Sequence, residues 1–343
     1  MIRTTFTLAL ALAACHDDGT SDAAYQAEVV TAMHDSIGAD LAELVASAQD
    51  LQAAAPTHAW SATGDAAAIA AMRDAWKRTR VAYEHVEGAT APIFPDADYA
   101  MDARYDDYLS KLGAAGDPDP FDARGVTGMH GIERILYAPD IRKEVIAFER
   151  DLPGYQAAAW PRSDAEATSF KIALCGKLVS DAQALRDQWV PAKIDLGAAF
   201  QGLVGLMNEQ KEKVNLAASG EEESRYANIT LFDLRNNLDG TSKIYALFQA
   251  WIQSSDDRAE RDRAIVARLG ELRSLYAMTA GDELPAVPAT WSSDAPSAED
   301  LATPFGMLWS KIHLAVAPAA AGSVVFEMNA VATLLGFPEF VEE

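Results

Sequence analysis

The chain has 343 residues, of which 50% are hydrophobic, and 28 Lys and Arg stand against 51 Asp and Glu, for a formal net charge of −23. This length needs one large domain or two of medium size, and the apolar fraction is enough for a sizeable core. The acidic balance argues against nucleic acid as a partner, because binding phosphates needs a basic face. Carboxylates in excess suit hard cations, although solubility alone also accounts for such a surface.

The N-terminus has the features of a secretion signal. Arg3 precedes an apolar stretch, residues 6–14, that is too short to span a bilayer as a stable helix. The sequence LAAC at 12–15 resembles a bacterial lipobox, which implies cleavage before Cys15 and acylation of that cysteine. Acyl chains would then anchor the protein in the cell envelope, and His16 in place of aspartate favours the outer membrane, facing the periplasm. The alternative is an ordinary signal peptide in which Cys15 is incidental.

Helical periodicity dominates the rest of the chain. Apolar residues recur every three or four positions, most clearly in the series Leu231, Leu234, Leu238, Tyr245, Phe248 and Ile252. No sustained alternation of period two predicts a strand. Breaks rich in Gly, Pro or polar residues are expected to be loops at 88–99, 113–127, 216–224 and 281–298.

Long helices joined by short links predict antiparallel helical bundles. We therefore expect an all-α protein in four parts: a lipoprotein signal peptide at 1–14, a tether at 15–24, an N-terminal bundle at 25–215 and a C-terminal bundle at 216–343.

The sharpest local feature is the sequence GMHGIE at 128–133. On a helix, where each residue turns by about 100°, His130 and Glu133 flank the apolar stripe of Met129 and Leu136 and point toward one neighbouring groove. An imidazole and a carboxylate three residues apart can share one metal ion, as in helical-bundle iron sites. The plain alternative is a hydrogen bond or ion pair on the helix surface, because His-x-x-Glu arises often by chance.

Two acidic segments precede this motif. The apolar face through Tyr83 extends to Glu87, with Glu84 alongside, so a carboxylate falls where the pattern predicts an apolar side chain. A buried, unpaired carboxylate needs a cation, a proton or water, unless the apolar stripe has ended and both acids face solvent. Asp102 and Asp106 are four residues apart and share a helix face, or lie at a solvated junction between a loop and a helix.

Together these side chains form a set rich in oxygen and poor in nitrogen. Such a set suits a hard, highly charged ion, Fe³⁺ or Fe²⁺, better than a soft metal. Calcium would normally bind without the histidine, and structural zinc would take more Cys or His, so zinc fits less well.

Three blocks of the chain, in order, resemble the imelysin domain of EfeO- and EfeM-type iron-uptake proteins. The blocks are AYEHVEGATAPIFPDADYAMDARYDD at 82–107, GMHGIERILY at 128–137 and EESRYANITLFDLRNNLDG at 222–240. The resemblance extends over roughly residues 25–340. It implies two packed four-helix bundles, with a metal site between helices of the first bundle.

Carried over by position, the resemblance implies a set of ligand candidates: Glu84, Glu87, Asp102, His130 and Glu133. Asp106 is the substitute for Asp102. In the third block, Arg225, Asp233 and Asn237 are interpreted as packing and buried hydrogen bonding, not as ligands. No catalytic residue is predicted.

The resemblance is to the single-domain, EfeM-like form, because no segment resembles the cupredoxin-like domain that EfeO also carries. It implies an iron-binding lipoprotein that takes part in uptake, with an iron permease or another envelope protein as its partner. Two other functions stay open. One is an imelysin-type metallopeptidase, although the sequence lacks His-Glu-x-x-His. The other is a helical surface module that binds protein or glycan, in which the motif serves structure alone.

Overall fold

The structure is a computed structural model that describes residues 21–112, 116–125 and 127–342. The expected signal peptide, Cys15 and most of the expected tether lie outside the described residues. The end of that tether is helical, because α1 (Asp22–Ala54) begins directly after Ser21, whose hydroxyl accepts a hydrogen bond from the backbone N–H of Ala24. In the described ranges, no helix combines the length and apolar character needed to cross a membrane.

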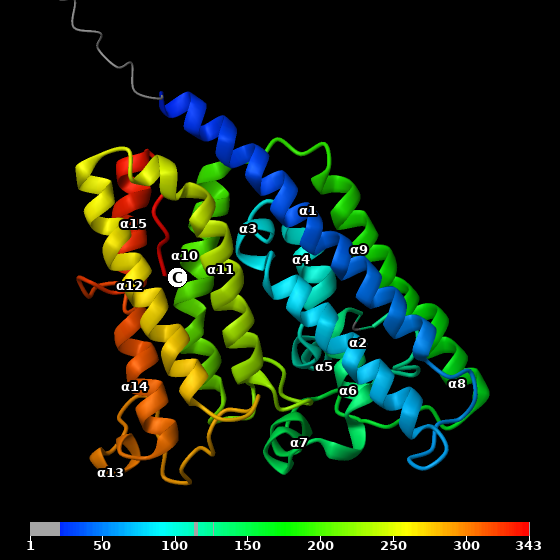
Figure 1. Ribbon diagram of the computed structural model, residues 1–343. Helices are drawn as coiled ribbons and strands as arrows, with labels where there is room; N and C mark the ends of the chain where they lie inside the picture. Colours follow the sequence, from blue (N-terminus) through cyan, green and yellow to red (C-terminus); the bar gives the residue numbers. More distant parts are fainter. Residues whose placement is uncertain (1–20, 113–115, 126, 343) are drawn as a thin grey trace, which may run out of the picture.

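The predicted all-α class is confirmed, since the described residues form helices and connections but no strand. A first group of helices is built on three long members: α1, α2 (Ala66–Glu84) and α9 (Cys175–Trp189). α1 packs along both α2 and α9 (Figure 1). A short α8 (Asp164–Ser169) and a π-helical turn (Phe170–Leu174) lead into α9.

Short helices fill the chain between α2 and α9: α3 (Glu87–Thr90), α4 (Pro95–Asp102), α5 (Tyr105–Leu112), α6 (Met129–Leu136), a 3-10 turn (Ala138–Asp140) and α7 (Lys143–Arg150). The prediction of a loop at 88–99 is wrong, since α3 and α4 occupy most of it. Pro95 does not interrupt α4, because it lies in the first turn, where its missing N–H has no partner to lose.

The second group contains five larger helices and one short one: α10 (Leu196–Leu216), α11 (Thr230–Ile252), α12 (Asp256–Met278), α13 (Ala298–Leu301), α14 (Pro304–Val316) and α15 (Val324–Leu335). α10 packs on α11, α14 and α15, and α12 packs on α11 and α15 (Figure 1). The expected domain boundary between residues 215 and 216 stays a prediction, since α10 packs on α3 of the first group as well as on the later helices.

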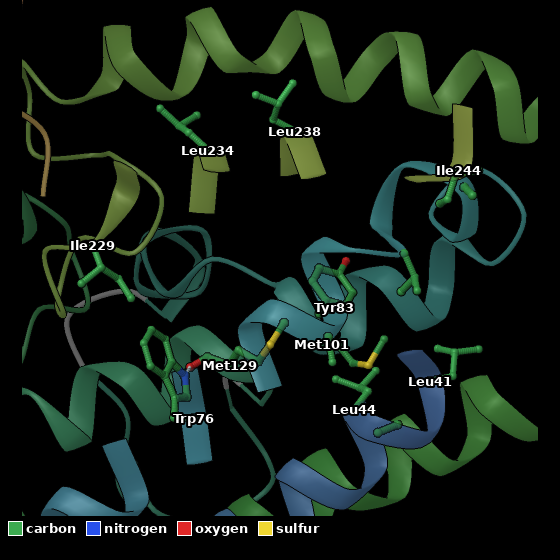
Figure 2. Packing of buried hydrophobic residues seen from close by; sticks show 14 of the residues in the cluster. Leu41, Leu44, Trp76, Tyr83, Met101, Met129, Ile229, Leu234, Leu238 and Ile244 are labelled. Atoms are coloured by element: carbon green, nitrogen blue, oxygen red, sulfur yellow. Dashed lines mark hydrogen bonds between the residues drawn. The ribbon is translucent and has the colours of Figure 1, made fainter. Parts of the chain in front are cut away.

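One continuous apolar core joins the two groups. The predicted stripe on α11 is buried along its whole length, from Leu231 to Ile252. Figure 2 shows the junction of the two groups. Trp76 and Tyr83 of α2 and Met129 of α6 lie on one side of it, and Leu238 of α11 lies on the other. The Trp76 indole N–H donates to the Met129 carbonyl oxygen at 3.0 Å, which ties α2 to the start of α6.

Two glycines allow close approaches between helices at this junction. Gly128 has φ +92°, and a Cβ there would lie 2.4 Å from the carbonyl oxygen of Met101, at the end of α4. A Cβ on Gly240 of α11 would lie 2.5 Å from the Cα of His85 and 2.8 Å from the carbonyl oxygen of Glu84, at the end of α2. Only glycine avoids these overlaps, so α6 meets α4 and α11 meets α2 closely.

Candidate metal centre

The candidate centre is built around His130, a buried residue in the first turn of α6. Its Nδ1 lies 2.9 Å from Glu133 Oε2, one turn further along the helix. Glu133 Oε1 accepts hydrogen bonds from the backbone N–H groups of Tyr226 and Ala227, at 2.9 and 2.8 Å. A carboxylate held in this way fixes the imidazole, and Nε2 is left to face the cluster.

Nε2 of His130 faces two carboxylates from separate segments of the chain. Asp102 Oδ1, at the end of α4, is 3.3 Å away, and Glu223 Oε1, in the loop between α10 and α11, is 3.5 Å away. Each residue offers one ligand atom, and the three atoms lie within 4.8 Å of one another. Nε2 has no well-aligned hydrogen bond to any side chain or backbone group that the structure describes.

These separations fit a single metal ion. Ligand atoms bound at about 2.1 Å to one ion lie about 3.0 Å apart at a right angle and about 3.4 Å apart at the tetrahedral angle. The distances of 3.3 and 3.5 Å from His130 Nε2 to the two oxygens are those of neighbouring ligands. Two carboxylates and one imidazole form a hard donor set that suits iron.

A fully buried arginine, Arg80 on α2, lies against both carboxylates. Its Nη1 is 2.5 Å from Asp102 Oδ1, and its Nη2 is 3.0 Å from Glu223 Oε1. Nε lies 3.4 Å from Asp233 Oδ1, and Nη2 also contacts Glu84, one turn along α2. One guanidinium therefore contacts four carboxylates, which lowers the cost of burying them together.

A second polar group adjoins the first. Asn237 on α11 donates to Glu87 Oε2 at 2.9 Å and also to Glu84. Its Oδ1 accepts from Lys213 Nζ at 3.0 Å, and the same ammonium lies 3.5 Å from Glu223 Oε2. The amide of Asn237 thus joins the acids of α2 and α3 to the cation of α10.

The electrostatics of the three converging residues favour their charged forms. Burial alone would lower the pKa of His130, but the charge of Asp102 raises it well above its usual value. Burial would raise the pKa of Asp102, yet Arg80 and His130 bring it below its usual value. The pKa of Glu223 is also held well below its usual value against burial, chiefly by Lys213. A metal ion that binds Nε2 must therefore displace a proton from His130.

Glu84 and Glu87 have the opposite tendency. Burial raises the pKa of both carboxyl groups, well above the usual value for Glu84, and the nearby cations Arg80 and Lys213 only partly oppose it. Burial away from water disfavours the charged form of a carboxyl group, and a proton or a nearby cation relieves that cost.

All five predicted ligands lie in this one cluster, but they face different neighbours. Asp102 and His130 supply two of the three converging atoms. Glu133 contacts the opposite ring nitrogen, and Glu84 and Glu87 face an amide of α11. Direct metal binding by these last three carboxylates stays a prediction.

Sequence reasoning missed Glu223 and Arg80. Glu223 is the last acid of the run at 221–223, which reads as a polar break, and nothing in that run distinguishes a ligand from a solvated acid. Arg80 had a usable signal, because it interrupts the apolar stripe of α2 and lies four residues before Glu84.

The remaining predicted residues lie around the centre. Asp106, the substitute for Asp102, forms an ion pair with Arg225 at 2.6 Å. Asp233 and Asn237 are fully buried and contact the cluster through hydrogen bonds, in line with the interpretation of the third block.

The fold and this centre define an all-helical protein with a buried cluster of histidine and carboxylates where its two helix groups meet. A model of the imelysin family matches residues 37–288, well over half of the chain, and the chain belongs to that family.

Known relatives agree with this assignment. "Iron uptake system component EfeM" of Pseudomonas syringae pv. syringae is 29% identical over 188 residues, which cover 55% of this chain and 52% of the relative. "Iron uptake system component EfeO" of Escherichia coli (strain K12) is 27% identical over 239 residues, 70% of this chain and 52% of the relative. The chain thus spans about half the length of these curated relatives.

The crystal structure of an imelysin-like protein from Psychrobacter arcticum 273-4 has the same fold. It superimposes with a TM-score of 0.60 at 16% identity, over 94% of this chain and 98% of the other.

Proposed function

We propose that this protein binds iron outside the cytoplasm and takes part in iron uptake. Asp102, His130 and Glu223 are the proposed ligands, and Glu133 orients the imidazole. The observation that carries the proposal is the convergence of one nitrogen and two oxygens, from three separate segments, at separations that suit one ion. The names of the relatives, both components of iron uptake systems, support iron as the metal.

The burial of the centre suits a small ion better than a peptide substrate. The side chains of His130 and Glu223 are 4% and 6% exposed, and Asp102, at 19%, is the most open of the three. A peptide substrate needs open surface around the reacting atoms, and these side chains are largely enclosed. The geometry therefore favours ion binding over hydrolysis.

Location and partners form a further part of the proposal. Acylated Cys15 would anchor the protein in the envelope, at the outer membrane facing the periplasm, and an iron permease or another envelope protein would receive the metal. Labelling of cells with tritiated palmitate, comparing wild type with Cys15→Ser, tests the anchor. Label in the wild type alone is expected, whereas equal label in both proteins would refute acylation at Cys15.

The metal proposal is tested by titration of the purified protein with Fe²⁺ under anaerobic conditions and with ferric citrate in air. His130→Ala and Glu223→Gln should each weaken binding by about tenfold or more, since each removes one of three ligands. His34→Ala is the matched control, because the His34 ring packs against Trp189 of α9 in a tilted arrangement, with ring centroids 5.4 Å apart, and not against the cluster.

Glu84→Gln, Glu87→Gln and Glu133→Gln belong in the same series, because they test the further ligands that the sequence predicts. Iron binding that is equal in wild type, His130→Ala and Glu223→Gln would refute the centre. Binding of Zn²⁺ together with no detectable binding of either iron ion would refute iron as the cargo.

A further inference from the structure

The guanidinium of Arg80 and the ring of His130 face the same two oxygen atoms. Asp102 Oδ1 lies 2.5 Å from Arg80 Nη1 and 3.3 Å from His130 Nε2. Glu223 Oε1 lies 3.0 Å from Arg80 Nη2 and 3.5 Å from His130 Nε2. An ion bound to these oxygens and to Nε2 would therefore lie close to a positive charge that is fully buried. Two like charges at this range, away from water, repel strongly.

Arg80 has two further carboxylate partners: Asp233 lies at Nε, and Glu84 contacts Nη2, the nitrogen that also faces Glu223. Asp233 and Glu84 are both fully buried. Among the described residues, Asp233 Oδ2 has no hydrogen-bond partner, and Glu84 Oε1 contacts the guanidinium without a well-aligned hydrogen bond. A buried carboxylate oxygen without a partner is costly, so Asp233 Oδ2 has unused capacity to accept from the guanidinium, while Glu84 Oε1 already contacts it.

We propose that Arg80 is the internal competitor of the metal at this centre, an inference that rests on the proposed function. When no metal is bound, the guanidinium bridges Asp102 and Glu223 and keeps the ligand oxygens together. When an ion binds, the guanidinium gives up these two contacts and keeps Glu84 and Asp233. At these two oxygens the metal ion thus replaces the guanidinium, and the loss of the arginine contacts limits the affinity of the centre for the metal. Arg80 is thus a positioning residue that moderates how tightly the cargo is held.

Arg80→Gln removes the competing charge and keeps a side chain of similar shape. It should bind Fe²⁺ more tightly than wild type, by about tenfold or more, since the repulsion and the broken contacts are both gone. Without metal the variant should be less stable, because four carboxylates lose their counter-ion. The rise in melting temperature on adding Fe²⁺ should therefore be larger than in wild type. A role in folding alone would lower stability and leave affinity unchanged.

Glu84→Gln gives an independent test. The substitution weakens one of the two contacts that the guanidinium keeps when a metal ion binds, so Fe²⁺ binding should become weaker in the wild-type background. In the Arg80→Gln background that loss should shrink, because no guanidinium has to be accommodated. If Glu84 instead bound the metal directly, the same fold loss would appear in both backgrounds. The double-mutant cycle separates these roles.

The experiment uses the whole chain, Fe²⁺ alone under anaerobic conditions, and circular dichroism to show that each variant is folded. If Arg80→Gln does not fold, Arg80→Lys replaces it. Lysine keeps the charge but cannot bridge two carboxylates with a planar fork, so affinity should still increase, by a smaller factor. Affinity equal to or lower than wild type in the folded variant would overturn the inference. A wild type that binds neither Fe²⁺ nor ferric iron supplied as citrate would refute the proposed function instead.

Discussion

Gly128→Ala is a direct test of how the backbone builds the centre. The substitution forces an L side chain into φ +92° and ψ −167°, a region that almost only glycine occupies, at a cost of about 1–3 kcal/mol. The new Cβ would also lie 2.4 Å from the Met101 carbonyl oxygen, so α6 must move away from α4. The combined destabilisation should be about 3 kcal/mol or more.

That movement also separates two proposed ligands. His130 lies in the first turn of α6, two residues after Gly128, and Asp102 follows Met101 at the end of α4. A displacement of α6 lengthens the 3.3 Å separation between His130 Nε2 and Asp102 Oδ1. Iron affinity should therefore fall by about 10–100-fold, as it does when the support of a metal ligand is disturbed.

Urea unfolding and Fe²⁺ titration measure the two effects. Gly270→Ala is the matched control, because Gly270 lies inside α12 and a Cβ there would meet nothing within 4 Å. It should stabilise the protein by about 0.5–1 kcal/mol, as alanine does over glycine in a helix, and leave iron binding unchanged. A Gly128→Ala protein as stable as wild type would refute the claim that this glycine sets the contact between α4 and α6.

Three further predictions follow from the same contacts. Glu133→Gln should lower the free energy of unfolding by about 1–3 kcal/mol, because the amide cannot accept both backbone N–H groups and the imidazole proton as well. Urea unfolding measures the loss, and Glu144→Gln on the surface is the control. Burial raises the pKa of Asp98 to about 7 and of Glu209 to about 8, so the folded protein holds protons that the unfolded chain has lost. As the pH rises from about 5 to 8, the free energy of unfolding of the metal-free protein should fall by up to about 1.4 kcal/mol per pH unit for each of these protons. A thermal-unfolding series in which the melting temperature stays level or rises over this range would contradict the prediction. Gly240→Ala should cost about 1–3 kcal/mol in the same unfolding assay, because its Cβ overlaps the backbone at the end of α2; an unchanged midpoint would show that α2 and α11 can separate freely.

Much of the fold could be predicted because the long helices carry regular apolar stripes. The series from Leu231 to Ile252 on α11 is buried as its spacing predicts. The short helices at 87–102 could not be predicted in this way, since an element of one or two turns shows too few repeats. Gly88 and Pro95 then dominate the pattern, although tertiary packing makes both segments helical.

The residues of the candidate site likewise differ in whether a local pattern in the sequence predicts them. His130 and Glu133 could be predicted because their spacing on one helix is a local property. Glu223 could not, because it reaches the imidazole only through the return of the chain after α10, about ninety residues later in the sequence. Long-range approaches of this kind depend on packing, such as the contact at Gly128, and leave no periodic signal.

The charged groups around the proposed ligands also affect which ion suits the cluster, because they set its net charge. Arg80 contacts four carboxylates, those of Glu84, Asp102, Glu223 and Asp233, and Glu87 adjoins them through Asn237. Two further cations, Lys213 and Arg104, lie 3.5 and 3.9 Å from Glu223 Oε2, so the carboxylates still outnumber the cations. With a neutral imidazole as ligand, a trivalent ion would offset more of this surplus of negative charge than a divalent one. Networks that serve structure alone gain nothing from such a surplus, because every unbalanced buried charge costs several kcal/mol or takes up a proton. Burial raises the pKa values of Glu84 and Glu87, and a cation bound nearby would oppose that rise.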